Sequence, residues 1–175
     1  ELAEQKFRRE ARSRLRAAQA YVIGGGPAED VFHPNIDIVP GPGVDIVCDL
    51  EHDRLPFHDG HAVSVKAIHS LQHLCRDGAR HVLRECARIM QSQAVLFIMI
   101  GDFAFIMERI QEDGMVDAWL NCVFHGTNDD DHFGFHKWGY TYESLKSEVE
   151  AAGFSNVRHC GHYNRWEFKM SATRL

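Results

Sequence analysis

The sequence of 175 residues lacks close cysteine pairs and long apolar runs. Its cysteines stand singly, at Cys48, Cys75, Cys86, Cys122 and Cys160. Zinc ribbons and disulfide frameworks need cysteines at close or regular spacings, so we expect neither. Single cysteines suit a reducing compartment. The longest apolar run covers only residues 94–100, far short of the roughly 18 residues that a transmembrane helix needs. We therefore expect a soluble, cytoplasmic protein.

An excess of basic residues is absent too. Acidic residues outnumber basic ones by 25 to 19, which gives a formal net charge of -6, so tight binding to nucleic acid is not expected. The local exception is KFRREARSRLR at residues 6–16. We interpret it as the solvated face of an N-terminal helix within residues 1–20, or as a docking surface for a partner or an acidic substrate. Residues 21–175 are expected to form a single globular domain.

Helical and strand patterns alternate along the chain. Short apolar, β-branched segments predict strands at residues 20–25, 35–39, 44–50, 63–71, 94–102, 156–160 and 166–173. Helical patterns cover residues 2–19, 72–90 and 141–154. The last of these helices has Thr141 as its N-cap and Gly153 as its stop. This alternation predicts an α/β fold with a mostly parallel central sheet and helices on both faces.

Glycines and carboxylates follow the first three predicted strands. In a parallel sheet, ligands bind outside the carboxyl ends of the strands, near the point where strand order reverses. The motif GGGP at residues 24–27 lets the backbone approach a ligand, while Asp37 and Asp49 close the next two strands. GGGP is neither GxGxxG nor a P-loop, and Pro27 removes a donor, so phosphate binding is disfavoured. We predict a nucleoside-type pocket, with a plain glycine turn as the alternative.

Six segments, taken in order, carry a family resemblance: YVIGGGP, NIDIVPGPGVDIVCDLE, LPFHDG, IHSLQHL, LRECARIM and HKWGYTYESLKSEVEAAGF. Together they cover residues 21–154 and resemble class I S-adenosylmethionine-dependent methyltransferases. The similarity is to the small, divergent, type 11-like group associated with saccharide biosynthesis. The resemblance implies a three-layer Rossmann-like fold and methyl transfer from S-adenosylmethionine, with S-adenosylhomocysteine as product. It further implies O-methylation of a small or saccharide-like acceptor, with N-methylation less favoured.

The resemblance also assigns a cofactor site, which comprises Gly24, Gly25, Gly26, Asp37, Ile38, Asp49, Leu50 and His69. By this assignment the glycines pass close to the methionine part of the cofactor. Asp37 binds the ribose hydroxyls and Asp49 holds the adenine. His69 lies next to the sulfonium and the incoming acceptor, although a core histidine that closes its strand is an equal alternative.

Three features depart from the pattern of the family. Tyr-Val-Ile at residues 21–23 lacks the usual acidic residue before the glycines, and Gln72 replaces a common glutamate. Gln-Ser-Gln at residues 91–93 replaces a Pro-Gly-Gly turn, where glycine would relieve backbone strain. These departures keep a second hypothesis open. The chain could be a methyltransferase-like binding or scaffold domain, catalytically weak or inactive, that docks in a larger assembly through residues 6–16.

Residues 119–141 are expected to recognise the acceptor, because they are rich in aromatic residues and histidines. A histidine could take the proton of an acceptor hydroxyl. The candidates are His125, His132 and His136 in this segment, and His69 at the end of its strand; His136 is favoured because HKxGY matches the related group. A structural or surface role is the alternative for each. Alignment of acceptor and methyl group could also supply most of the acceleration.

The cluster DDDH at residues 129–132 suggests a metal site at first sight. Adjacent aspartates cannot all face one centre, so we predict no metal. The partners expected are a small-molecule or saccharide acceptor, and a second copy of the chain or a neighbouring domain that completes the site. Neither nucleic acid nor a membrane is expected as a partner.

Overall fold

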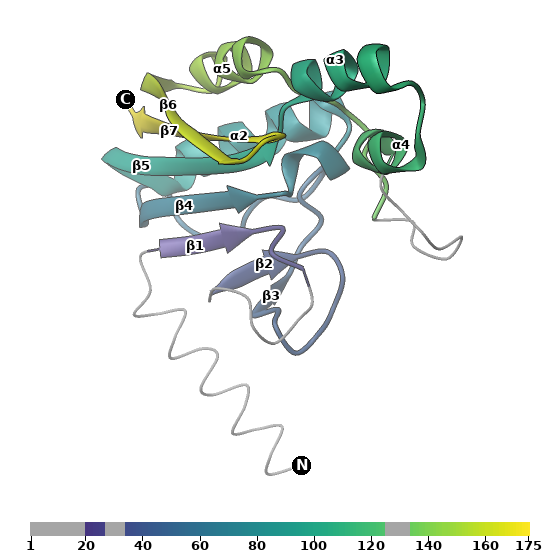
Figure 1. Cartoon of the computed structure of the whole chain (residues 1–175). Coiled ribbons are helices and arrows are strands. Elements are labelled where there is room, and N and C mark those ends of the chain that lie inside the picture. The colour runs from purple at the N-terminus through teal and green to yellow at the C-terminus, as the bar shows by residue number, and fades with distance from the viewer. Residues whose placement is uncertain (1–19, 27–33, 125–133) are drawn as a thin grey trace.

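A seven-stranded sheet organises the chain (Figure 1). The computed structural model describes residues 20–26, 34–124 and 134–175, so the helix expected over residues 2–19 lies outside the described part. The strands are β1 (Ala20–Ile23), β2 (Asn35–Asp37), β3 (Ile46–Val47), β4 (Ala62–Ile68), β5 (Met90–Gly101), β6 (Phe154–Asn164) and β7 (Glu167–Arg174). Their spatial order is β3-β2-β1-β4-β5-β7-β6. The mixed α/β fold class is confirmed.

Strand direction fixes where a ligand can bind. Neighbouring strands from β3 to β5 are parallel, whereas β7 is antiparallel to both β5 and β6. β1 lies between β2 and β4, so the order of the strands reverses beside β1. The loops after β1 and β4 therefore diverge at this point and leave a crevice at the carboxyl edge of the sheet.

The helical segments among the described residues are η1 (Leu71–His73), α2 (Arg76–Ile89), α3 (Phe103–Asp113), α4 (Asp117–Phe124) and α5 (Tyr142–Ala151). α5 matches its prediction closely. The Thr141 hydroxyl accepts the Ser144 amide proton, the Ser144 hydroxyl accepts that of Thr141, and Gly153 has φ 100° just after the helix. Helices α3 and α4 were not predicted. No residue of α4 is buried, so it has no core-facing stripe for sequence periodicity to detect.

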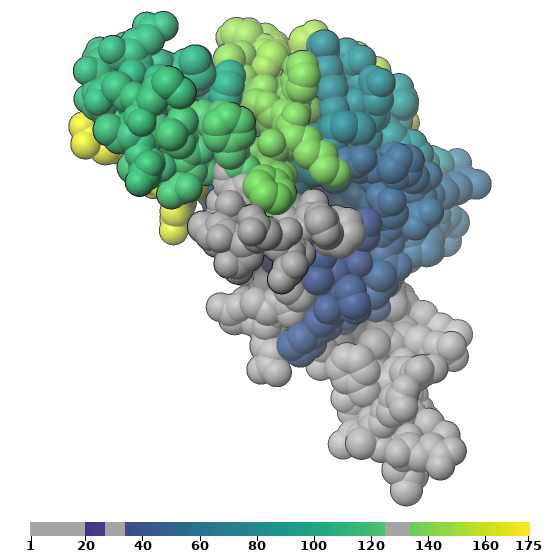
Figure 2. Space-filling view, turned by 90° about the vertical axis from the view of Figure 1, so that its right-hand side faces the viewer, coloured from purple at the N-terminus to yellow at the C-terminus, as the bar shows by residue number. Residues whose placement is uncertain are grey.

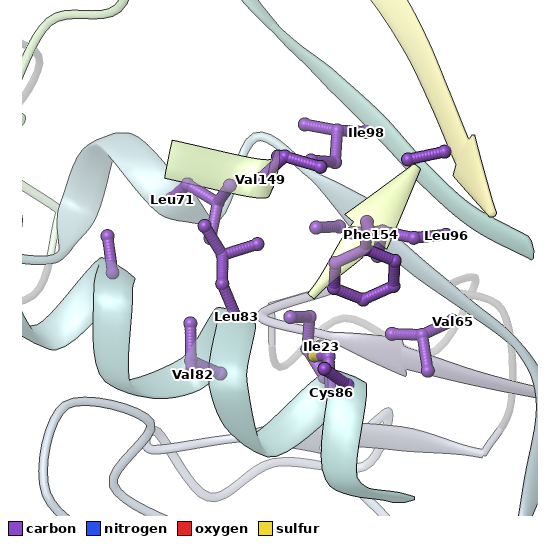
Figure 3. Packing of buried hydrophobic residues seen from close by; sticks show 14 of the residues in the cluster. Ile23, Val65, Leu71, Val82, Leu83, Cys86, Leu96, Ile98, Val149 and Phe154 are labelled. Carbon is purple, nitrogen blue, oxygen red and sulfur yellow. The ribbon is translucent and has the colours of Figure 1, made fainter. Parts of the chain in front are cut away.

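The hydrophobic core fills the space between the sheet and helices α2 and α5 (Figure 3). Side chains at most 2% exposed come from α2 (Val82, Leu83, Cys86), β5 (Leu96, Ile98), α5 (Val149) and the start of β6 (Phe154). Full burial of one such side chain contributes about 1.5–3 kcal/mol. This packing holds the strand ends at fixed positions, which a binding site at their carboxyl edge requires.

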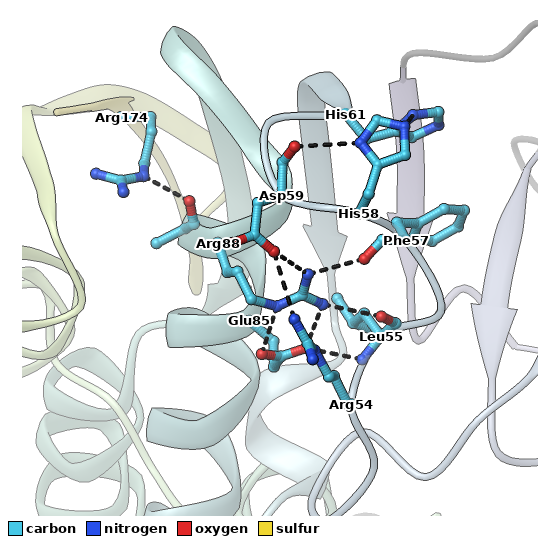
Figure 4. A network of polar contacts seen from close by, with 10 residues as sticks. Arg54, Leu55, Phe57, His58, Asp59, His61, Glu85, Arg88 and Arg174 are labelled. Carbon is cyan, nitrogen blue, oxygen red and sulfur yellow. Dashed lines mark hydrogen bonds and ion pairs between the residues drawn. The ribbon is translucent and has the colours of Figure 1, made fainter.

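A polar network secures the opposite edge of the sheet (Figure 4). The Arg88 guanidinium, near the end of α2, donates to both carboxylate oxygens of Glu85 and to Asp59. It also donates to the backbone carbonyls of Leu55 and Phe57. The hydrogen bonds from Arg88 lower the pKa of Glu85, although burial opposes them. Because these residues precede β4 and β5, the network tethers the segment before β4 to α2 and stays clear of the carboxyl edge.

Gln93 adopts a left-handed backbone conformation, with φ 68°, inside the segment where glycine was expected. A residue with a Cβ pays about 1–2 kcal/mol for that conformation, whereas glycine loses about 0.5–1 kcal/mol more backbone entropy than alanine. We therefore expect Gln93→Gly to raise the free energy of unfolding by about 0.5–1 kcal/mol, measured by urea denaturation. The neighbouring exposed Ser92 has no positive φ, so Ser92→Gly should lower the free energy of unfolding. Equal effects of the two variants would contradict this account.

In the described part of the chain, no helix is both long enough and apolar enough to cross a membrane.

Candidate functional site

A cavity of about 680 Å³ lies at the carboxyl ends of β1 to β4. All of the predicted cofactor residues line it: Gly24, Gly25, Gly26, Asp37, Ile38, Asp49, Leu50 and His69. Figure 2 looks onto this edge, where the light green segment after residue 134 lies near the blue segments that follow β2. Binding sites for small ligands commonly have volumes of about 300–1,000 Å³. Asp37 and Asp49 thus face one shared cavity, as their places in the sequence suggested.

Gly24 and Gly25 of the glycine loop pack too tightly for a side chain. Gly24 has φ 63°, and a Cβ there would lie 2.4 Å from Ser70 Cβ. A Cβ on Gly25 would lie 2.6 Å from Asn35 Oδ1, which accepts the Gly25 amide proton at 3.0 Å. The Gly26 amide donates to Asp37 Oδ2 at 2.8 Å. The amides of Gly25 and Gly26 thus donate to protein side chains, which agrees with the prediction that the loop does not bind a phosphate.

Asp37 ends β2 and is only 8% exposed. Its Oδ2 accepts from Gly26, and its Oδ1 accepts the Val39 amide proton at 2.9 Å. Both oxygens are therefore fixed in direction, yet each carboxylate oxygen keeps a second lone pair for a ligand. Such a carboxylate, rigid and aimed along the cavity wall, can accept hydrogen bonds from a pair of neighbouring hydroxyls.

Asp49 and Glu51 shape the other side of the cavity. Asp49 accepts from the Glu51 amide and contacts His52 Nδ1, each at 2.9 Å. Burial alone would raise the pKa of Asp49, but the hydrogen bonds from His52 and Glu51, with the charges of His52 and Lys137, outweigh it and lower that pKa. Glu51 Oε1 accepts from Lys137 Nζ at 2.9 Å and from the Cys75 amide at 2.7 Å. The sequence did not predict this ion pair, which ties the segment at residue 137 to the wall of the first cavity.

A second cavity of about 310 Å³ adjoins the first and shares His69 and His73 with it. Its walls come from the end of β5, from α3 and α4, and from the start of β7. The segment predicted to recognise an acceptor supplies several lining residues: Asn121, Cys122, Val123, His136, Trp138, Gly139 and Tyr140. Two cavities that adjoin at His69 and His73 can hold a donor and an acceptor of a transferred group side by side.

His69 sits at this junction in a strained conformation. It follows β4 with φ 52°, a left-handed value that is uncommon for a residue with a side chain. Its amide donates to Met99 O, and its Nε2 lies 3.1 Å from Glu167 Oε1. The His69 side chain is 36% exposed, whereas that of Glu167 is only 5% exposed. Backbone strain of this kind is concentrated at functional sites.

Glu167 is a site residue that sequence analysis did not single out. Its Oε2 accepts from Asn164 Nδ2 at 2.6 Å. Burial raises the pKa of Glu167, and the hydrogen bond from Asn164 offsets part of that rise. A carboxylate at the start of a predicted buried strand was the available signal, but only the pairing of β7 with β5 brings it to His69.

His136 also lines the second cavity. Its Nδ1 lies 3.0 Å from Cys122 O, a carbonyl that only accepts, so Nδ1 carries the proton there. The His136 ring meets the His73 ring edge to face, with centroids 4.8 Å apart. His125 and His132 lie outside the described residues. Among residues 20–26, 34–124 and 134–175, no group of three histidines, cysteines or acidic residues is arranged to hold a metal ion.

Comparison with known proteins identifies the fold. No protein-family model and no curated protein sequence matches this chain. Solved structures do match. An S-adenosylmethionine-dependent methyltransferase from Archaeoglobus fulgidus has a TM-score of 0.61 and 15% identity, over 99% of this chain and 98% of that one. One from Thermotoga maritima has a TM-score of 0.58 and 12% identity, over 96% and 89%.

A third match is human N-acetylserotonin methyltransferase in complex with S-adenosylmethionine, with a TM-score of 0.54 and 12% identity. The match covers 94% of this chain but 51% of the human chain. At these identities the likeness shows the fold, so the Rossmann-like methyltransferase fold expected from the sequence is confirmed. The resemblance to a group associated with saccharide biosynthesis finds no support in these matches.

Proposed function

We propose that this chain transfers a methyl group from S-adenosylmethionine to an oxygen of a small acceptor. Among small acceptors, the sequence pointed to saccharide-like compounds. The observation that carries the proposal is the pair of adjoining cavities that share His69. One contains the glycine loop and the two strand-end aspartates, and the other has aromatic walls. The fold shared with S-adenosylmethionine-dependent methyltransferases supports this assignment.

The first cavity fits an adenosyl ligand in its chemistry. Asp37, fixed by two backbone amides, would accept hydrogen bonds from both ribose hydroxyls. Asp49 would accept from the exocyclic amine of adenine, with Leu50 as an apolar wall beside the ring. Gly24 and Gly25 allow the loop to pack closely against Ser70 and Asn35, which places the loop backbone at the wall of the first cavity. When bound, S-adenosylmethionine supplies a methyl group on a positively charged sulfur, which makes that carbon strongly electrophilic.

His69 is the best-placed base for the acceptor. Its Nε2 lies 3.1 Å from the buried carboxylate of Glu167, and that negative charge favours the uptake of a proton by the ring. The acceptor oxygen bonds to the methyl carbon as the carbon–sulfur bond breaks, and that electron pair returns to sulfur. The hydroxyl proton passes to His69, and Glu167 stabilises the imidazolium that forms. A positioned base of this kind contributes about 10²–10⁴-fold.

Calorimetric titration with S-adenosylmethionine and S-adenosylhomocysteine tests the proposal. Micromolar binding of both compounds is expected. Absence of heat with either compound, in a chain shown to be folded by circular dichroism, would favour the alternative of a binding or scaffold domain. The measurement precedes any search for the acceptor, because it depends only on the first cavity.

The Asn164–Glu167 hydrogen bond should control the acid side of the pH profile. Protonated Glu167 cannot stabilise an imidazolium at His69, so kcat/KM should fall as the pH drops through the raised pKa of Glu167. Asn164→Asp replaces the donor of that bond by a second carboxylate and should move this limb upward by about one pH unit or more. Ser155→Ala, in the same strand but bonded to Thr173, is the control and should leave the profile unchanged. An unshifted limb in Asn164→Asp would rule out this role for Glu167.

A further inference from the structure

Two buried side-chain polar atoms, on residues that line the second cavity, lack a hydrogen-bond partner within the described part of the chain. They are Gln72 Oε1 and the Tyr140 hydroxyl oxygen. Gln72 is 6% exposed and Tyr140 is 1% exposed, and both residues line the cavity. A buried polar group without a partner destabilises a fold, and each such group in a native structure calls for an explanation. A ligand that bears hydrogen-bond donors and acceptors would supply the missing partners.

The backbone around these atoms is held by hydrogen bonds. The carbonyl oxygen of Gln72 accepts the amide protons of Lys137 and Trp138, at 2.7 and 3.2 Å. The carbonyl oxygen of Tyr140 accepts that of Phe103 at 2.9 Å. Burial raises the pKa of Tyr140 to about 12, so its hydroxyl stays neutral and can both donate and accept. The backbone hydrogen bonds of Gln72 and Tyr140 thus fix the positions from which the two unpartnered side chains extend.

The cavity walls are suited to a flat ring. Phe103, Trp138 and Trp166 contribute aromatic surface, and the volume of about 310 Å³ is at the lower end for small-ligand sites. The Arg76 guanidinium carbon lies 5.3 Å from the centre of the Trp138 ring, which helps to hold that ring in place. Aromatic side chains pair favourably with another ring, stacked or edge to face. A saccharide would instead present hydroxyls around its whole ring, more than two unpartnered protein atoms can satisfy.

Acidity points the same way. A phenolic hydroxyl has a pKa of about 10, whereas an aliphatic hydroxyl is about as weak an acid as water, near 15.7. A phenol is therefore on the order of 10⁵-fold easier to deprotonate than a sugar hydroxyl. A single histidine paired with a carboxylate is a weak base, so it is matched to the more acidic acceptor.

We propose that the acceptor is a small aromatic alcohol, methylated on a phenolic oxygen beside His69, whose second hydrogen-bond donor is bound by Gln72 Oε1. Tyr140 supplies a further hydrogen bond to the same substituent. This inference rests on the proposed methyltransferase function and names the class of its acceptor. The phenolic proton passes to His69 as the oxygen–carbon bond forms, and the products are an aryl methyl ether and S-adenosylhomocysteine.

A matched probe series tests the acceptor class. The probes are catechol, resorcinol, hydroquinone, phenol, cyclohexanol and methyl α-glucopyranoside, each with S-adenosylmethionine, and the readout is S-adenosylhomocysteine formed. We expect turnover of phenol but not of cyclohexanol, and a kcat/KM at least about ten-fold higher for the best dihydroxybenzene. Quenching of tryptophan fluorescence by that dihydroxybenzene, in the complex with S-adenosylhomocysteine, reports acceptor binding without turnover, because Trp138 and Trp166 line the cavity.

Gln72→Met tests the assigned contact. Methionine has nearly the same shape but no carbonyl oxygen, and the backbone bonds of residue 72 remain. The ratio of kcat/KM for the best dihydroxybenzene to that for phenol should fall from about ten toward one. Tyr140→Phe should lower the same ratio, which keeps the test decisive if one variant folds poorly. Gln91→Met, an exposed residue at the start of β5, is the control and should leave the ratio unchanged.

Each contrary outcome has its own meaning. A ratio unchanged in both Gln72→Met and Tyr140→Phe, or turnover of cyclohexanol or the glucoside at the rate of phenol, overturns the inference about the acceptor. The same conclusion follows if S-adenosylmethionine binds but no phenolic probe quenches fluorescence or reacts. A chain that binds neither S-adenosylmethionine nor S-adenosylhomocysteine overturns the proposed function itself.

Discussion

Replacing His69 by asparagine should lower kcat/KM for methyl transfer by about 10²–10⁴-fold. Asparagine is among the few residues that tolerate a left-handed backbone, so the variant should keep the φ of 52° and fold normally. It cannot accept the acceptor proton as imidazole does. Steady-state kinetics with saturating S-adenosylmethionine measure the loss, and calorimetry should find that binding of this compound changes far less than turnover.

Two further variants separate the base from its surroundings. Glu167→Gln keeps the shape of the carboxylate but removes the charge 3.1 Å from His69 Nε2, so turnover should fall by about 10-fold or more. His73 is the other histidine that lines both cavities, and His73→Asn should lower turnover less than His69→Asn does. If His69→Asn keeps turnover within about three-fold of the native chain across the pH range, alignment alone drives the reaction and no base is needed.

Asp37→Ala should weaken the binding of S-adenosylmethionine by about 100-fold or more, because two effects combine. The variant loses the acceptor for the ribose hydroxyls, and it also loses the hydrogen bonds that fix Gly26 and Val39 at the cavity wall. Hydrogen bonds to a charged group contribute about 1.5–3 kcal/mol each. Calorimetric titration of the folded variant measures the change in Kd.

Asp77→Ala is the matched control for this prediction. Asp77 lies on α2 with its side chain 90% exposed, so its removal should leave the Kd unchanged. The Kd of Asp37→Asn should lie between those of Asp37→Ala and Asp77→Ala. One side-chain oxygen remains as an acceptor, while the new NH₂ group faces a backbone N–H donor. Binding within about three-fold of the native chain in Asp37→Ala would show that the carboxylate serves the loop and not the ligand.

The lining of the first cavity was predictable because its residues are close to one another in the chain and follow from strand ends. Parallel strands bring their carboxyl ends to one edge, so glycines after β1 and aspartates after β2 and β3 converge without knowledge of the tertiary fold. Gln93 is a similar case, since its position in a turn that favours glycine was visible before its φ of 68° was known. The N-cap at Thr141 depends only on local hydrogen bonding.

The lining of the second cavity was predicted less completely. Residues 119–141 were predicted to recognise the acceptor, and several of the described ones line this cavity. Helices α3 and α4 were missed because few of their residues are buried, and periodicity reports burial. Motif likeness favoured His136 as the base, whereas the proposal made from the structure places that role on His69.

The sequence by itself determined the parallel sheet, the glycine loop and the two carboxylates of the first cavity, since these follow from local patterns and the common direction of the strands. Only the tertiary structure decided that His69 meets Glu167 and that Gln72 and Tyr140 face the same space. The physical reason is that β7 inserts antiparallel beside β5 and carries a buried carboxylate from the end of the chain to the end of β4. No local pattern encodes that meeting, because it depends on strand order and register.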